Sequence, residues 1–303
     1  MDRDPVHTPA VCRPAAGRKE EAVTETRTRI EGPSAGVGNP SAPARRRRAI
    51  PVGAAGLPFL GLVIALACWW LVTTGFGLVH PAALPSPQAV GASMADRSGV
   101  LLPALGITTL MTVVGFLLSA AAGVLIGIAL AASRHLERMF APLLVAVNAV
   151  PKIALGPLLV VSFGWGAKPV LTMVFLLCFF PIVLSTSTGL TTTPADLAEL
   201  ARSLHASWWQ SFRKVRLPAA LPQVFVGLKV AMPLAAIGAV IGEFYSDQPG
   251  LGYQILQYNG IGETATAWAA IVLIAAMSIG LYSLLYLVER LALPWVRATT
   301  SAR

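Results

Sequence analysis

The sequence predicts an all-α, polytopic membrane protein with about six transmembrane helices and a disordered N-terminal tail. Hydrophobic residues make up 55% of the 303 residues and charged residues only 12%, whereas a soluble domain carries about 25% charged residues. The apolar residues also fall into long blocks that are almost free of charge, as a bilayer requires. A soluble protein is therefore excluded.

The tail, residues 1–49, differs in composition from the rest of the chain. It holds ten basic residues, six acidic residues and six prolines, so it cannot bury enough apolar surface to offset its chain entropy and is predicted to be disordered. Four arginines, residues 45–48, precede the first apolar run, residues 52–74. This run exceeds the roughly 7–15 residues of a signal-peptide core. We therefore expect a retained anchor with its N-terminus inside.

Five further blocks each exceed the roughly 20 residues that a spanning helix needs. We divide the rest of the chain into a first helix with an outer loop, residues 50–100, and a five-helix core, residues 101–297. The predicted spans of this core are residues 101–132, 139–163, 169–190, 223–244 and 266–289.

Basic residues set the predicted orientation. With the tail inside, the inner segments hold nineteen Lys and Arg residues and the outer loops only Arg97 and Lys168, while Lys152 and Lys229 lie within or at the edge of spans. Basic residues concentrate on the cytoplasmic side of membrane proteins. Both termini are therefore predicted to be cytoplasmic, and the net charge of +9 reflects topology rather than a nucleic-acid partner.

The longest inner loop, residues 190–222, contains a predicted amphipathic helix. Thr193 is a suitable N-cap, Pro194 occupies the first helical position, and Asp196 lies near the positive end of the helix dipole. Trp208 and Trp209 follow in a second segment, far from any membrane interface. A solvated loop, or a helix lying on the lipid surface, is the alternative interpretation.

The order of residues in this loop favours a more specific interpretation. Glu199-Leu200-Ala201, three residues, His205 and then residues 215–218, Val-Arg-Leu-Pro, resemble the E-A-A, three residues, G, then I-x-L-P signature of ABC importer permeases. More closely, the chain resembles the branch that carries nitrate, sulfonate, taurine, bicarbonate or thiamine-pyrimidine precursors. Further similar motifs are Leu-Pro-Ser-Pro at 84–87, Val-Pro-Lys-Ile-Ala-Leu at 150–155, Cys-Phe-Phe-Pro-Ile at 178–182 and Gly-Leu-Gly-Tyr at 250–253.

The resemblance covers residues 55–297 and has two departures. Leu200 replaces the first alanine of the pair, and His205 replaces the usual glycine. A backbone turn that needs a positive φ at position 205 is less favourable for histidine than for glycine.

The resemblance implies a permease subunit whose loop is a cytoplasmic coupling helix that docks on a separate ATPase. It also implies a homodimer around a central pathway, with an extracytoplasmic binding protein that delivers solute. ATP and Mg would bind to the partner ATPase, with no cofactor on this chain. Residues assigned to the coupling loop are Asp196, Glu199, Leu200, Ala201, Arg202, Leu204, His205, Trp208, Trp209, Leu217 and Pro218.

The residues themselves agree that this chain is not the ATPase. A P-loop motif, G-x-x-x-x-G-K-[ST], is absent from the sequence. The few cysteines and histidines show no metal-ligand spacing. A membrane enzyme would need clustered catalytic groups. An ion-coupled transporter or channel, the remaining alternative, would show several intramembrane carboxylates or an internal repeat.

Three polar residues within the spans are candidates for the translocation pathway: Asn148, Lys152 and Glu243. Lys152 lies about 20 Å into its span, where a charge is costly unless it faces water or a partner, and Asn148 lies one turn before it. A buried contact that fixes helix packing is the alternative for this pair. Pro151, Gly156 and Pro157 predict a kink in the same span, and three glycines of the second span, at 115, 123 and 127, predict close helix packing.

Overall fold

The computed structural model describes residues 56–76, 80, 82–192, 199 and 203–294. Within these ranges the chain forms helices and no strand. The predicted tail, residues 1–49, lies outside the described residues, as do residues 193–198 and 200–202 of the long inner loop.

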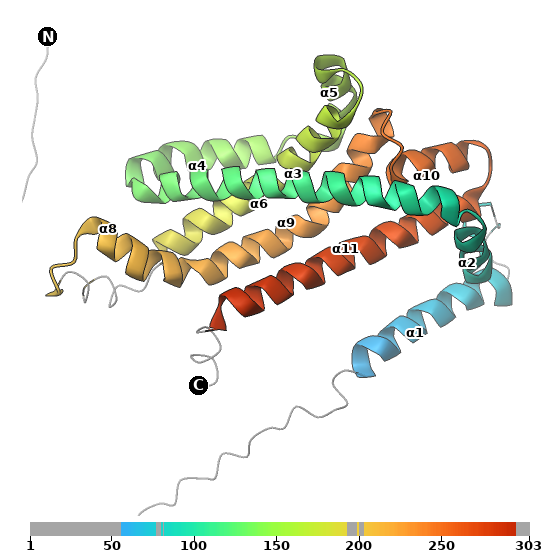
Figure 1. The fold of residues 1–303 in the computed structure, drawn as a ribbon, viewed down its shortest axis with the longest axis horizontal. Helices are drawn as coiled ribbons and strands as arrows, with labels where there is room; N and C mark the ends of the chain where they lie inside the picture. Colours follow the sequence, from blue (N-terminus) through green and yellow to red (C-terminus); the bar gives the residue numbers. More distant parts are fainter. Residues whose placement is uncertain (1–55, 77–79, 81, 193–198, 200–202, 295–303) are drawn as a thin grey trace, which may run out of the picture. The chain divides into compact units, whose positions relative to one another are not determined.

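Four of the described helices are long and apolar enough to cross a membrane. They correspond to the second, fourth, fifth and sixth predicted spans and lie in one bundle (Figure 1). Their bounds are α3 Ser98–Ala132, α6 Ala167–Thr191, α9 Leu217–Tyr245 and α11 Thr264–Ala292. The all-α class and the positions of these spans are confirmed.

Helix α6 is the centre of the bundle, because it packs against α3 and against α9. Val174, Cys178 and Ile182 of α6 are fully buried. On the α3 side, Gly115 faces Val174, Gly123 faces Ile182 and Gly127 faces Thr186 so closely that a Cβ atom would clash. The predicted packing role of these three glycines is confirmed. Small residues at such contacts allow two helices to approach within van der Waals distance in lipid, where burial of apolar surface supplies little attraction.

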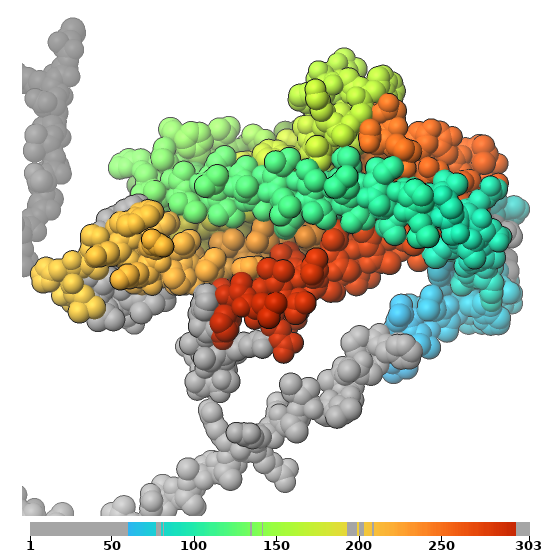
Figure 2. Space-filling model, viewed as in Figure 1, coloured from blue at the N-terminus to red at the C-terminus, as the bar shows by residue number. Residues whose placement is uncertain are grey.

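The third predicted span is bent. Helix α4 (Arg134–Asn148) and the segment formed by η3 (Lys152–Leu155) and α5 (Gly156–Phe163) meet at an angle of 75°. Pro151 lies at the break and has no N–H to continue a helix. The predicted kink is confirmed, and the expected single span 139–163 is a broken pair. Figure 2 shows α5 as a lobe that projects from the surface.

The first predicted span is described from residue 56 onward. Helix α1 (Gly56–Trp70) continues into the π-helical turn η2 (Leu71–Gly75), and residues 52–55 lie outside the described residues. Trp69 connects α1 to the rest of the protein: its indole N–H donates to the carbonyl of Pro85 over 3.2 Å, and its ring lies 6.0 Å from that of Trp268.

Two short helices, which we did not predict, lie at one end of the bundle (Figure 1). They are α2 (Pro87–Asp96) and α10 (Leu251–Gly260). Helix α2 begins where the hydroxyl of Ser86 accepts the N–H of Ala89 over 3.3 Å, with Pro87 at the first helical position. We call this end of the bundle the α10 end.

The opposite end carries α8 (Trp208–Ser211), and we call it the α8 end. A π-helical turn, η4 (Phe212–Arg216), joins α8 to α9, so that Trp209–Tyr245 is one helical stretch. We expected the inner loop to extend to residue 222. Its second half is instead a direct extension of α9.

We predict that Gly238→Ala destabilises the bundle. A Cβ at position 238 would lie 2.8 Å from the Cα and 3.1 Å from the N of Val174, and these backbone atoms cannot move without shifting α6. The expected loss is about 1–3 kcal/mol in free energy of unfolding, measured by thermal unfolding in detergent.

Gly280→Ala is the matched control, because a Cβ at position 280 has no neighbour within 4 Å. It should be neutral or stabilising, since alanine favours the helix by about 1 kcal/mol over glycine. Equal thermal stability of the two variants would contradict close packing of α6 and α9.

Candidate functional site

The predicted site residues lie in three separate places. The described coupling-loop residues belong to the α8 end, Asn148 and Lys152 lie at the break between α4 and η3, and Glu243 lies near the α10 end in the last turns of α9. The structure therefore brings Asn148 and Lys152 together and leaves Glu243 apart from them.

At the α8 end, part of the predicted amphipathic helix can be followed. Asp196, Leu200, Ala201 and Arg202 lie outside the described residues. Glu199 is exposed, and its carbonyl accepts the hydroxyl of Ser203 over 3.1 Å.

His205 has a φ of 52°, and it is the only residue other than glycine with a positive φ in the described part of the chain. This is the position at which the permease signature carries glycine. A left-handed conformation is costly for most residues with a Cβ, although histidine tolerates it better than β-branched residues do. The turn that the glycine of the signature would favour is therefore present here with histidine.

After this turn, α8 begins with a reciprocal cap. The N–H of Gln210 donates to the Ser207 hydroxyl over 3.3 Å, and the N–H of Ser207 donates to the Gln210 side-chain oxygen over 3.0 Å. This is a capping box, in which two side chains satisfy two free N–H groups. The Ser-x-x-Gln pattern could have been found in the sequence and was missed.

The surface of the α8 end is partly apolar. Leu204 is 73% exposed, and the exposed Trp209 stacks on Phe212 with 6.0 Å between the ring centroids. Trp208 belongs to α8, and Leu217 and Pro218 form the first turn of α9. Because α8, η4 and α9 are one helical stretch, any force on this surface acts directly on α9.

At the break in the third span, Lys152 and Asn148 form one polar group. The Lys152 ammonium donates to the side-chain oxygen of Asn148 over 2.8 Å and to its carbonyl over 3.0 Å. It also lies 5.2 Å from the ring centroid of Phe180, a distance at which a cation is attracted by the ring. The two ion pairs between described residues are Arg97–Glu263 and Lys229–Glu289, so neither provides Lys152 with a carboxylate.

Glu243 is fully buried between three helices. Its Oε2 accepts the hydroxyl of Thr108 in α3 over 3.0 Å and the N–H of Gly252 in α10 over 2.8 Å. Thr108 was not predicted as a functional residue, because it is one of three threonines in the same apolar run, at 108, 109 and 112, and the sequence does not single it out.

A second unpredicted polar contact joins α9 and α11. Lys229 donates to both carboxylate oxygens of Glu289 over 2.8 and 3.0 Å, and both side chains are largely buried. Opposite charges on two apolar segments are the sequence signal that could have indicated this pair.

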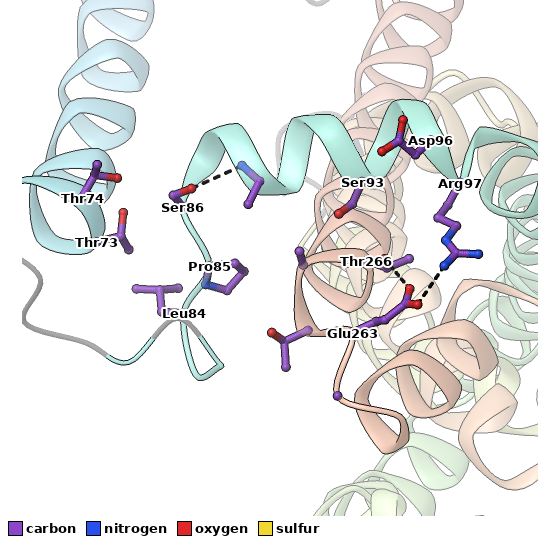
Figure 3. Close-up of a pocket in the computed structure, with 14 residues that line it drawn as sticks. Thr73, Thr74, Leu84, Pro85, Ser86, Ser93, Asp96, Arg97, Glu263 and Thr266 are labelled. Atoms are coloured by element: carbon purple, nitrogen blue, oxygen red, sulfur yellow. Dashed lines mark hydrogen bonds and ion pairs between the residues drawn. The ribbon is translucent and has the colours of Figure 1, made fainter.

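The α10 end contains a hollow of about 660 Å³ between η2, α2 and the start of α11. Figure 3 shows Arg97, Glu263 and Thr266 on one side of it. Arg97 pairs with Glu263 over 2.8 Å, and the hydroxyl of Thr266 donates to the other Glu263 oxygen over 3.3 Å. Ser93 and Asp96 of α2 line the hollow as well, together with apolar residues such as Leu84 and Pro85, so its wall is partly polar.

Taken together, the bent helical bundle and the helix that leads from the α8 end into α9 define a membrane permease. Residues 123–297 match the family described as binding-protein-dependent transport system inner membrane component, and the chain belongs to this family of ABC importer permeases. The family supplies no catalytic centre of its own, because ATP hydrolysis resides on a separate subunit.

Several named transport permeases align with most of this chain. The aliphatic sulfonates transport permease protein SsuC of Bacillus subtilis is 32% identical, over 79% of this chain and 87% of that protein. The riboflavin transport permease RibX of Chloroflexus aurantiacus is 35% identical, over 80% and 90%. The formylaminopyrimidine transport permease ThiX of Halalkalibacterium halodurans is 32% identical, over 78% and 95%.

The fold is also similar to that of a solved transporter. The inward-facing MetNI methionine ABC transporter contains a chain that aligns with a TM-score of 0.52 at 21% identity, over 63% of this chain and 98% of that chain. At this identity the likeness concerns the fold alone.

We predict that His205→Gly stabilises the turn before α8, whereas His205→Val destabilises it. Glycine relieves a backbone conformation that costs about 1–2 kcal/mol for a residue with a Cβ, and valine adds a β-branched side chain. The measurement is the rate of limited proteolysis within the loop, together with co-purification of the partner ATPase.

His205→Asn is the matched control, because asparagine tolerates positive φ, and it should behave like the original protein. If the valine and glycine variants were cleaved at the same rate and retained the ATPase equally, the turn would have no role in the loop.

Proposed function

We propose that this permease works as a homodimer with a separate ABC ATPase, and that an extracytoplasmic binding protein delivers a small anionic solute to it. Membership of the family supports the classes of partner in general. The location of the docking surfaces and the charge of the solute are inferred from the geometry of the described residues.

Orientation is the first step of this proposal. Arg213, Lys214 and Arg216 lie in η4 at the α8 end, and basic residues favour the cytoplasmic side. The α8 end then faces the cytoplasm, both termini are cytoplasmic, and the α10 end faces outward in the cell membrane.

The second step places the ATPase at the α8 end. Leu204 and Trp209 are exposed and offer an apolar contact, and aromatic side chains are frequent anchors of interfaces. Glu199 is exposed as well and offers a charge. We assign docking to the whole predicted coupling loop, which includes the residues that lie outside the described ranges: Asp196, Leu200, Ala201 and Arg202.

The third step concerns the pathway, and the Lys152–Asn148 group is the observation that carries it. An ammonium group inside a span needs water, a counter-ion or a partner, and among the described residues the contacts of Lys152 are the neutral oxygens of Asn148 and the ring of Phe180. Two copies of the chain around a central pathway would place this cation where a passing anion can supply the missing charge.

The relatives are designated for different solutes, among them riboflavin. Those designated for aliphatic sulfonates, nitrate and taurine handle small solutes with an anionic group. Lys152 favours such an anion for this chain, with a sulfonate, taurine, nitrate or bicarbonate as candidates. A thiamine-pyrimidine precursor, suggested by the formylaminopyrimidine relative, is the second candidate and would not require the cation.

We predict that cysteines introduced at Gly91 and Gly260 react with a membrane-impermeant thiol reagent in intact cells, whereas a cysteine at Ser207 does not. Positions 91 and 260 have open space around the Cα, and Ser207 is exposed, so all three should accept cysteine in a cysteine-free parent. The position-207 variant should react only after permeabilisation. Labelling of position 207 in intact cells would contradict the proposed orientation.

We also predict that Lys152→Met lowers transport of an anionic solute by about tenfold or more, because one charge-assisted contact is lost. Methionine keeps the length of the side chain without its charge. The measurement is uptake by vesicles that contain the permease, the ATPase and the binding protein, with sulfonate, taurine, nitrate and formylaminopyrimidine compared.

Lys168→Met is the matched control, since Lys168 is an exposed lysine at the start of α6, and its uptake should be unchanged. Normal uptake by Lys152→Met, with the ATPase still bound, would contradict the inference that the solute is an anion that contacts Lys152. Selective uptake of the pyrimidine would then favour the second candidate.

A further inference from the structure

Helix α10 begins at a glycine, which has no side chain to cap the helix. Gly250 is the N-cap residue, and it makes no side-chain hydrogen bond. The first N–H groups of a helix have no partner within it, and leaving them unpaired in a buried place is costly. Leu251 and Gly252 are both buried, so their N–H groups need partners from elsewhere.

Two side chains from other helices supply these partners. The N–H of Leu251 donates to the Thr108 hydroxyl over 2.8 Å, and the N–H of Gly252 donates to the Glu243 carboxyl over 2.8 Å. The Thr108 hydroxyl donates in turn to the same Glu243 oxygen over 3.0 Å. Thr108 thus accepts from α10 and donates to α9 at once, and three helices meet in one buried network.

Gly250 and Gly252 allow the Glu243 carboxyl group to approach the backbone of α10. A Cβ at position 252 would lie 2.7 Å from the carbonyl oxygen of Val240 and 3.0 Å from the Cβ of Glu243, and a Cβ at position 250 would overlap the Glu243 carboxyl group. The Gly-Leu-Gly sequence that opens α10 therefore has a physical reason, since only glycine allows the carboxyl group to reach the backbone.

The second half of α10 and the residue that follows it carry exposed apolar side chains. Leu256 and Ile261 are 45% and 67% exposed. Arg97 lies 5.7 Å from the ring of Tyr258 and forms the ion pair with Glu263 on the wall of the hollow. The position of α10 thus determines the shape of this end of the bundle.

We propose that Thr108 and Glu243 are positioning residues that cap α10 from outside and so hold the outward surface in the form that the solute-binding protein recognises. This inference deepens the proposed function, since it requires the α10 end to face outward. If only a fraction of the molecules has the surface in its binding-competent form, the apparent affinity for the partner is reduced by that fraction.

Thr108→Val tests the proposal, because valine keeps the shape of threonine and removes the hydroxyl that both donates and accepts. In the reconstituted complex, the concentration of binding protein that gives half-maximal ATPase stimulation should rise by about tenfold. The maximal rate should stay within about twofold. Hydrogen exchange of the same complex should be faster at the amides of Leu251 and Gly252.

Two matched variants give the controls. Thr112 is one turn further along α3, is equally buried, and its hydroxyl donates only to the carbonyl of Thr108 over 2.7 Å, so Thr112→Val should leave both measurements unchanged. Thr108→Ser keeps the hydroxyl and should restore tight binding of the partner. If Thr108→Val does not reach the membrane, Gly252→Ala replaces it. This variant should likewise raise the half-maximal concentration of binding protein and leave the maximal rate nearly unchanged.

The proposal is overturned if Thr108→Val changes neither the half-maximal concentration of binding protein nor the hydrogen exchange at Leu251 and Gly252. It is also overturned if Thr108→Val lowers the maximal ATPase rate as much as the affinity, or if Thr112→Val raises the half-maximal concentration as Thr108→Val does. A binding protein that fails to stimulate the original complex with any solute would refute the proposed function instead. Exchange at Leu251 and Gly252 would then decide the role of the cap by itself.

Discussion

Close contact between backbones is the constraint on which this structure depends. In a lipid environment the helices gain little from burying apolar side chains against one another, so they must gain from contact at short range. Helix α6 meets the glycines of α3 on one side, and its own backbone at Val174 and Val170 meets Gly238 and Gly242 of α9 on the other. The same requirement recurs at Gly252, where the backbone of α10 meets a carboxyl group of α9.

This rigid centre contrasts with the bent pair formed by α4 and α5. The break at Pro151 leaves backbone groups that a continuous helix would satisfy, and it is here that the chain places Lys152 and Asn148. Irregular backbone at membrane depth is tolerated where it lines a polar or water-filled space. The break lies beside α6, while α3, α6 and α9 provide the frame of the bundle.

Composition and periodicity predicted the features that depend on long apolar runs. The four long helices, the kink at Pro151 and the contact glycines of α3 all follow from local patterns. Features that depend on single polar residues from distant segments could not be predicted. Thr108 and Glu243 are 135 residues apart, and no local pattern indicates that they meet. Lys229 and Glu289 are 60 residues apart, and their opposite charges on apolar segments are the one signal that the sequence carries for that pair. The short helices α2 and α10 were missed because each is too short to show a clear period.

The continuous helical stretch from Trp209 to Tyr245 has a mechanical consequence. Its 37 residues form a rod of about 55 Å at 1.5 Å per residue, with the α8 surface at one end and Glu243 close to the other. Such a rod, held near its middle by glycine contacts with α6, acts as a lever arm with a fulcrum. A tilt of about 5° around that middle displaces each end by about 2 Å over half of such a length, so a small displacement of the α8 surface moves the Glu243 end in the opposite direction.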